Sequence, residues 1–223
     1  MEKRNTTLIT VFSLLACIAH GAMLYTPFND YLYTSAAKFI LFMLCPILYL
    51  AFSKNGTLRE LFFSKGNAKS IKYSLLFGLI VFVTVFIGFA IVRPWLDESM
   101  IVDAMANVGI TSNNYIFVVM YYVIVNVALE ELFFRGFIFL AIYRMGYKYY
   151  AHIFSSLLFA IYHVAIMRYG VEPALLVLST VGLIGVGFLF NEITRRCNNV
   201  VGSYAVHVCA SLAISIIGFY FIR

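Results

Sequence analysis

The sequence predicts an all-α, polytopic integral membrane protein, a helical bundle with about seven transmembrane helices. Of its 223 residues, 63% are hydrophobic and only 12% are charged, whereas a soluble domain has roughly 25% charged residues. Apolar runs of about 20 residues, the length that crosses a bilayer, recur along the chain. No regular apolar/polar alternation indicates a β-barrel. The composition therefore excludes a soluble enzyme, a disordered protein and a disulfide-stapled secreted domain.

The apolar runs predict seven spans within a single membrane domain, residues 1–223. These spans are Leu8–Tyr25, Tyr31–Phe52, Tyr73–Val92, Tyr115–Tyr143, Tyr150–Met167, Ala174–Phe190 and Val200–Phe221. The first has an alternative interpretation as a signal peptide, because Leu14–Cys17 is similar to a lipoprotein cleavage box. Two connecting segments, Thr57–Lys65 and Trp95–Asn114, carry apolar residues at helical spacing. Each predicts either a short helix at the membrane interface or an ordinary loop.

Glycines in the sixth span suggest how it packs. Gly182, Gly185 and Gly187 lie close together in the sequence. Small residues in a transmembrane helix let two backbones approach closely. We therefore expect this helix to pack tightly against a neighbour at these positions.

The distribution of basic residues predicts the orientation. The net charge is +6, but the basic residues lie in short loops between apolar runs, which sets membrane topology and gives no nucleic-acid surface. With the N-terminus inside, eleven basic residues are internal and three external. The internal ones are Lys3, Arg4, Lys54, Arg59, Lys65, Lys69, Lys72, Arg144, Lys148, Arg195 and Arg196; the external ones are Arg93, Arg168 and Arg223. We predict a multi-pass cell-membrane protein surrounded by lipid, with a cytoplasmic N-terminus and an external C-terminus.

The fourth span contains three charged residues: Glu130, Glu131 and Arg135. Intramembrane charges are costly and indicate function. Glu131 and Arg135 are four residues apart, so they share a helix face and can pair. Glu130 lies about 140° from Arg135 at 3.6 residues per turn, and it needs a partner on another helix or a proton. Two interpretations remain open: Glu130 is a general base, or the three charges form a network that only holds helices together.

Two histidines favour a site around Glu130. His163 lies in the fifth span and His207 in the seventh, and both could face Glu130 across the bundle. His152 precedes His163 by eleven residues, which is about 16 Å of helix, so we place it at the interface; we treat His20 as structural. Spans four, five and seven are expected to meet around a polar cavity that opens laterally or to the cytoplasm.

These residues resemble the motifs of one protease family. The stretch from Glu130-Glu131 to Arg135-Gly136, the Phe159-x-x-x-His163 pattern, and the region from Gly187 to His207 are similar in order and spacing to the CPBP family. This family comprises the CAAX-protease and bacteriocin-processing (Abi) intramembrane proteases, including the type II CAAX prenyl endopeptidases. The resemblance covers about residues 115–215, which would form the catalytic core.

The resemblance implies an intramembrane endopeptidase and a role for each matching residue. Glu130 and His163 would activate a water, His207 and Ser211 would stabilise the oxyanion, and Glu131, Arg135 and Phe159 would support the site. Ser211 departs from the family, which usually has Asn or Asp at this position. A hydroxyl has one donor and an amide has two, so oxyanion stabilisation is expected to be weaker.

Cofactor and substrate expectations follow from the same residues. Glu130, His163 and His207 could bind Zn²⁺ with a water in the fourth position, and they could equally act without metal; we prefer the scheme without a tightly bound metal. The expected substrate is a membrane-embedded or lipid-anchored protein or peptide. One alternative is a non-proteolytic membrane factor of the bacteriocin self-immunity type. Another is a small transporter, which the absence of a detected repeat disfavours. The sequence carries no signal for oligomeric state.

Overall fold

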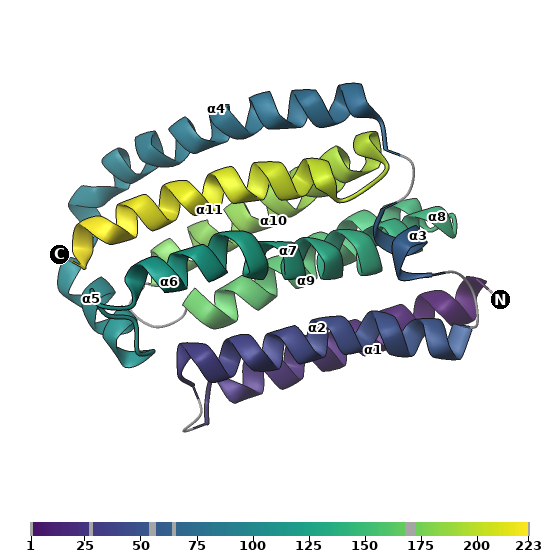
Figure 1. The fold of residues 1–223 in the computed structure, drawn as a ribbon, viewed down its shortest axis with the longest axis horizontal. Coiled ribbons are helices and arrows are strands. Elements are labelled where there is room, and N and C mark those ends of the chain that lie inside the picture. The colour runs from purple at the N-terminus through teal and green to yellow at the C-terminus, as the bar shows by residue number, and fades with distance from the viewer. Residues whose placement is uncertain (1, 27–28, 54–56, 64–65, 168–172, 223) are drawn as a thin grey trace.

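The described part of the chain is an all-helical bundle. The computed structural model describes residues 2–26, 29–53, 57–63, 66–167 and 173–222, and these residues contain no strand. Helices α1 (Glu2–Met23) and α2 (Tyr31–Ser53) form a pair along one side of the bundle. Helices α4 (Ala68–Val92) and α11 (Val201–Phe221) form a pair along the opposite side (Figure 1). The predicted all-α fold is confirmed.

The middle of the bundle holds the remaining long elements. Helix α9 (Lys148–Met167) packs against α10 (Pro173–Cys197). The fourth predicted span contacts α9, α10 and α11 as well as both helices of the α1–α2 pair, and it lies in the middle of the bundle (Figure 1). The start of α1 and the end of α11 lie at opposite ends of the bundle.

Six helical segments of the described residues are long and apolar enough to cross a membrane, against seven predicted. They are Glu2–Met23, Tyr31–Ser53, Ala68–Trp95, Tyr115–Arg144, Pro173–Cys197 and Val201–Phe221. The fifth predicted span is the helix α9, which is not among the six. Within α9, Ser155 and Ser156 are buried, and their hydroxyls are hydrogen-bonded to the Asn191 amide of α10. The protein is a multi-pass membrane protein. Lys54, Lys65, Arg168 and Arg223, which the predicted orientation also counts, lie outside the described residues.

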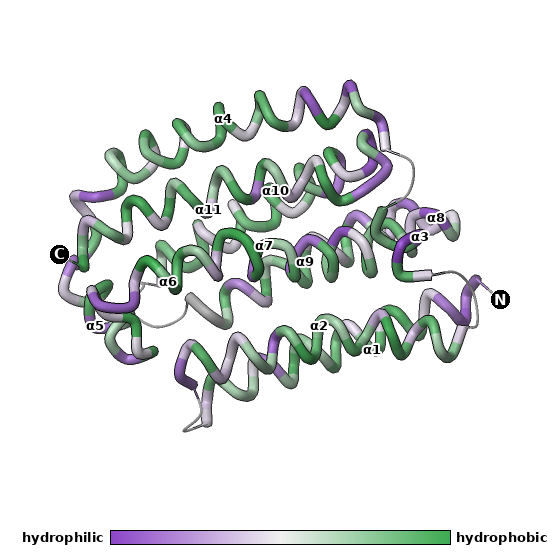
Figure 2. The backbone as a smooth tube through the Cα atoms, viewed as in Figure 1, coloured by the Kyte–Doolittle hydropathy of each residue, from purple (hydrophilic) through white to green (hydrophobic). Residues whose placement is uncertain are grey.

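Many large apolar side chains of the long helices are exposed, and hydrophilic residues gather toward helix ends (Figure 2). Helix α4 is the extreme case, because only Ser74 and Gly78 along it are buried. These small residues face α11, where a Cβ on Gly78 would lie 2.9 Å from Cys209 Sγ. A helix that is apolar all round and packs through small residues is expected for a lipid-facing span.

The fourth span is a helix of mixed geometry, whereas the sequence analysis placed Glu130 and Arg135 with the 3.6 residues per turn of a regular α-helix. It runs through α6 (Tyr115–Met120), the π-helical η2 (Tyr121–Asn126), α7 (Val127–Glu130), the π-helical η3 (Glu131–Leu140) and α8 (Ala141–Arg144). In a π-helix the hydrogen bonds run from i to i+5, and such segments often occur at functional sites. Here the change falls between Glu130 and Glu131.

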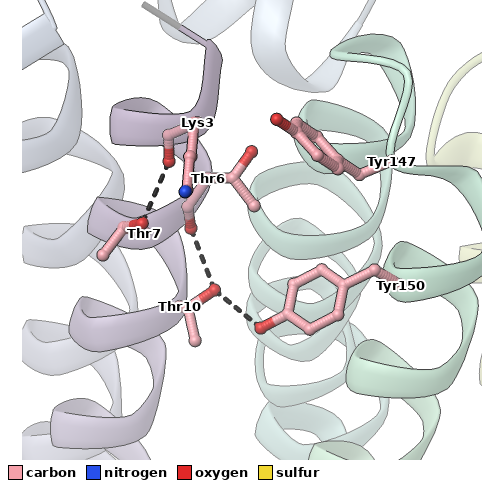
Figure 3. Close-up of a pocket in the computed structure, with 6 residues that line it drawn as sticks. All are labelled: Lys3, Thr6, Thr7, Thr10, Tyr147 and Tyr150. Atoms are coloured by element: carbon pink, nitrogen blue, oxygen red, sulfur yellow. Dashed lines mark hydrogen bonds between the residues drawn. The ribbon is translucent and has the colours of Figure 1, made fainter.

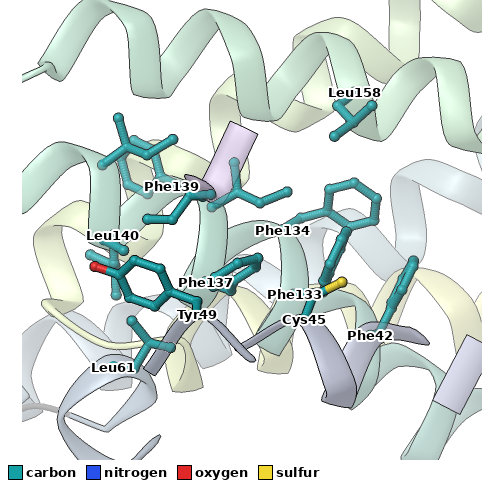
Figure 4. Packing of buried hydrophobic residues seen from close by; sticks show 14 of the residues in the cluster. Phe42, Cys45, Tyr49, Leu61, Phe133, Phe134, Phe137, Phe139, Leu140 and Leu158 are labelled. Atoms are coloured by element: carbon teal, nitrogen blue, oxygen red, sulfur yellow. The ribbon is translucent and has the colours of Figure 1, made fainter. Parts of the chain in front are cut away.

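Aromatic packing fixes the fourth span against α2. The ring of Phe42 in α2 stacks on Phe133 in η3, with centroids 3.9 Å apart and an interplanar angle of 8°. Phe134 and Phe137 continue this cluster along η3 (Figure 4). All four rings are fully buried. The stack sets the distance and register between α2 and the helix that carries Glu130.

Both amphipathic connecting segments contain helices. Within Thr57–Lys65, α3 (Leu58–Phe62) begins with a capping box between Thr57 and Glu60. Phe62 is buried, and its ring lies directly against Gly136 of η3, so α3 packs against the fourth span. Within Trp95–Asn114, the structure has α5 (Glu98–Asn107), which buries no residue.

The glycine prediction for the sixth span was right at one position of three. A Cβ on Gly187 would lie 2.8 Å from the Ser156 Cα, so α9 and α10 approach closely there. At Gly182 and Gly185, a Cβ would meet nothing within 4 Å among the described residues. The sequence cannot distinguish them, because the close approach depends on where the two helices cross.

We predict that Gly187→Ala destabilises the protein and Gly185→Ala does not. The first change forces backbone atoms apart and is expected to cost about 1–3 kcal/mol. The second meets open space and gains up to about 1 kcal/mol of helix propensity. Thermal unfolding of both variants in the same detergent measures the difference, and equal midpoints would contradict the predicted helix crossing.

Candidate active site

The carboxylate of Glu130 lies at the centre of a buried polar cluster. Glu130 is the last residue of α7, and 3% of its side chain is exposed. Its Oε2 lies 3.5 Å from Nε2 of His163 in α9 and 3.7 Å from Nε2 of His207 in α11. The structure therefore brings together residues from the fourth, fifth and seventh predicted spans.

The backbone of α9 orients His163. Its Nδ1 lies 2.9 Å from the carbonyl oxygen of Phe159. A carbonyl only accepts hydrogen bonds, so Nδ1 carries the proton in this arrangement. In the neutral ring, the Nε2 lone pair then points toward Glu130. The Phe159 ring also packs against the His163 ring, with centroids 4.2 Å apart.

His207 is oriented by the second glutamate. Its Nδ1 lies 2.9 Å from Oε1 of Glu131, so an ionised Glu131 accepts the Nδ1 proton. The side chains of the adjacent glutamates thus point in different directions. Glu130 faces the Nε2 atoms of both histidines, and Glu131 contacts Nδ1 on the opposite side of the His207 ring. A carboxylate in this position also stabilises a positive charge on the imidazole.

Arg135 balances the charge of Glu131. Its Nη1 lies 3.5 Å from Glu131 Oε1, as the four-residue spacing predicts, and both side chains are fully buried. Within the described residues, the guanidinium nitrogens make no hydrogen bond. Instead, the guanidinium lies 4.0 Å from the Phe159 ring centroid and 5.0 Å from that of Phe190. Cation–π contacts with these rings are strong where water is excluded.

Lys38 in α2 is a member of the site that the sequence analysis did not identify. Its Nζ donates to Oε1 of Glu130 at 2.8 Å and to Oδ1 of Asn126 at 2.5 Å. Asn126 Nδ2 also donates to Glu130 Oε1 at 3.1 Å. The signal was present, because Lys38 is a charged residue inside a predicted span. Its partner lies 92 positions away, which no local pattern reveals.

Ser211 lies one helical turn after His207 on α11 and is buried. Its hydroxyl makes no hydrogen bond of standard geometry within the described residues. The Tyr122 phenol lies beside it. A buried hydroxyl without a bond of standard geometry is suited to bind a group that enters the site.

The three side chains at the centre of the cluster differ in their exposure to solvent. The exposed fraction of the side chain is 19% for His163, 9% for His207 and 3% for Glu130. Of the three side chains, His163 is therefore the most exposed face of the cluster. A separate pocket of about 290 Å³ lies between the start of α1 and the start of α9, lined by Thr6, Thr10 and Tyr150 among others (Figure 3). It contains none of the predicted site residues.

The site residues do not fit a zinc ion in the arrangement observed. Glu130, His163 and His207 supply suitable donor atoms, but the Glu130 charge is already paired with Lys38. Lys38, Arg135, Glu130 and Glu131 together sum to zero charge, so a divalent cation would add two uncompensated positive charges to a buried site.

The fold and the cluster define a class: polytopic helical membrane proteins with a glutamate–histidine site inside the bundle. Residues 112–213 match the family described as type II CAAX prenyl endopeptidase Rce1-like. Over these residues the chain is therefore similar to this intramembrane protease family, in agreement with the resemblance stated above. No significant match to a curated protein or to a solved structure was found.

We predict that Arg135→Met destabilises the protein strongly and that Glu131→Gln partly restores stability. Arg135→Met leaves Glu131 as an unpaired buried charge, which costs about 3–5 kcal/mol. The double variant has no such charge. Thermal unfolding of the wild type, both single variants and the double variant in detergent measures the coupling. Additive effects of the two changes would contradict the pairing.

Proposed function

We propose that the protein is an intramembrane endopeptidase in which Glu130 activates a water to cleave a peptide bond. One observation carries the proposal: two imidazole Nε2 atoms, each oriented through its Nδ1, converge on one oxygen of a buried carboxylate. This arrangement supports the roles that the family resemblance implies. In this arrangement Glu130 Oε2 faces the two imidazoles, where a water could be activated, and Oε1 accepts from Lys38 and Asn126.

The attacking water would be held by two acceptors. Glu130 Oε2 and His163 Nε2 are 3.5 Å apart, and each accepts one water proton in the tautomer described above. The water oxygen then keeps a lone pair free to attack the scissile carbonyl carbon. Polar atoms at this separation are readily bridged by one water.

The developing oxyanion would be stabilised from α11. His207, with Nδ1 held by the Glu131 carboxylate, would place its Nε2 edge toward the oxyanion. The Ser211 hydroxyl adds a donor one turn along. Preorganised donors in a water-excluded site are often the largest catalytic contribution.

The proton balance follows from these positions. As the water oxygen bonds to the carbonyl carbon, Glu130 Oε2 takes its proton and the carbonyl oxygen becomes the oxyanion. Glu130 then returns the proton to the amide nitrogen, the C–N bond breaks, and a carboxylic acid and an amine leave. Glu130 is again a carboxylate, so the cycle closes without a further reactant.

We infer that the substrate is a membrane-embedded or lipid-anchored polypeptide, because the cluster lies within the spanning helices. The family name refers to prenyl endopeptidases; for this chain, we favour an anchored substrate without requiring a prenyl group. We also propose a cell-membrane location with the N-terminus in the cytoplasm and the C-terminus outside. This orientation is supported by the distribution of basic residues.

A second candidate is a non-proteolytic immunity or interaction factor on the same scaffold. The observation that favours it is the mutual neutralisation of the four buried charges, which a purely structural network would also have. Ser211, in place of the usual Asn or Asp, points in the same direction. The two candidates differ in whether Glu130 must accept a proton.

We predict that Glu130→Gln abolishes cleavage while the protein remains folded. Gln can hydrogen-bond but cannot act as a base, and loss of a general base costs about 10²- to 10⁴-fold in rate. The measurement is a quantitative profile of membrane-protein termini in cells lacking the gene, complemented at equal expression. Glu192→Gln, at a half-exposed glutamate paired with Arg195 and Arg196, is the control. Termini that persist with Glu130→Gln would reject the proteolytic function.

We predict that Ser211→Ala lowers kcat and leaves KM nearly unchanged. Removing one oxyanion donor typically costs on the order of 10²-fold in kcat. The measurement uses a peptide substrate identified from the termini profile and purified protein. Ser215→Ala is the control, because the Ser215 hydroxyl donates to the Ser211 backbone carbonyl and would affect helix packing alone. Equal kcat values for Ser211→Ala and wild type would show that His207 acts without this hydroxyl.

A further inference from the structure

We propose that Lys38 is a positioning residue that supplies, as a fixed ammonium, the positive charge that a bound metal would otherwise bring to Glu130. The part of this inference that concerns cleavage rests on the proposed function. It is carried by contacts from three elements. The ammonium lies 2.8 Å from Glu130 Oε1 and 2.5 Å from Asn126 Oδ1, and it lies 5.0 Å from the centroid of the Tyr162 ring.

The position of Lys38 is imposed by packing. Lys38 and Phe42 are four residues apart on α2, and so lie on one helix face. Phe42 stacks on Phe133, which follows Glu130 by three residues. The ring stack and the ion pair therefore join the same two helix faces, one turn apart. With 6% of its side chain exposed, the lysine does not extend to the membrane surface, as a lysine near a helix end does.

The two oxygens of Glu130 are consequently divided between two tasks. Oε1 takes the ammonium and the Asn126 amide. Oε2 faces the two imidazoles. Lys38 keeps the carboxylate ionised in a low-dielectric site, which is the form that a general base requires. It does so from the side opposite the histidines, and Oε2 stays accessible to water.

This division of the two oxygens predicts a property that can be measured without catalysis, namely the affinity of the site for metal ions. A metal held by Glu130, His163 and His207 would lie close to a permanent ammonium, so Lys38 repels any cation there. Removing the Lys38 charge leaves one carboxylate and two Nε2 atoms with no competing cation. The site is then expected to bind zinc.

The test measures zinc affinity in the full-length protein, purified in detergent without metal. We expect Lys38→Met and Lys38→Gln to bind Zn²⁺ at least tenfold more tightly than wild type, with a zinc-dependent rise in unfolding temperature that wild type lacks. Lys38→Gln can still donate a hydrogen bond to Glu130, and it replaces Lys38→Met in the test if that variant folds poorly. Adding Glu130→Gln to either variant should remove the gain, which locates the metal. Lys38→Arg keeps the charge and should match wild type.

Cleavage provides the second measurement. We expect both neutral variants to lose at least tenfold in kcat and Lys38→Arg to recover part of it. Phe42→Leu, which disturbs the ring stack without changing charge, should leave zinc affinity unaltered. Unchanged zinc affinity in both neutral variants, or a wild type that binds stoichiometric zinc and loses it with His163→Ala, would overturn the inference. Zinc binding is measured without substrate, so failure of the proposed proteolysis is recognised separately.

Discussion

Charge neutralisation inside the hydrocarbon region is the constraint on which the rest of this structure depends. Lipid offers neither water nor counterions, so each buried charge must meet an opposite charge from the protein. Lys38 with Glu130, and Arg135 with Glu131, satisfy this requirement. The first pair joins two helices, whereas the second lies within one segment. The difference matters, because a pair between helices fixes their separation, and the site exists only while α2 and α7 are in contact.

Aromatic rings help to stabilise these buried charges in a protein with few polar groups. Arg135 has no hydrogen bond to its guanidinium within the described residues, yet it contacts the faces of Phe159 and Phe190. Phe159 serves twice, since its carbonyl also accepts from His163. The same residue therefore stabilises a buried cation with its ring and sets the tautomer of His163 with its backbone. Substituting it would disturb both charge and geometry, which fits its place in the family motif.

How much the sequence predicts depends on the range of each interaction. Hydropathy is local, so the spans follow closely, and α2 begins at Tyr31 as expected. The Glu131–Arg135 pair is also local and was predicted from its spacing. The partner of Glu130 was not, because it required knowing that α2 packs against the fourth span. The π-helical geometry of η3 was missed for a similar reason: tertiary packing, with nine of ten residues buried there, overrides the usual helical repeat.

The asymmetry between the adjacent glutamates links the fold to the proposed chemistry. Successive residues on a helix point in different directions, so Glu130 and Glu131 cannot share one partner set. Glu130 faces α2 and α9, while Glu131 faces Arg135 and the far side of His207. One carboxylate is thereby committed to holding an imidazole, and the other keeps an oxygen for proton transfer. A single glutamate could not do both, because the two oxygens of Glu130 already face Lys38 and the two Nε2 atoms, whereas His207 Nδ1 lies on the Glu131 side of the ring. The doubled glutamate is thus explained by two separate tasks at one point along the helix.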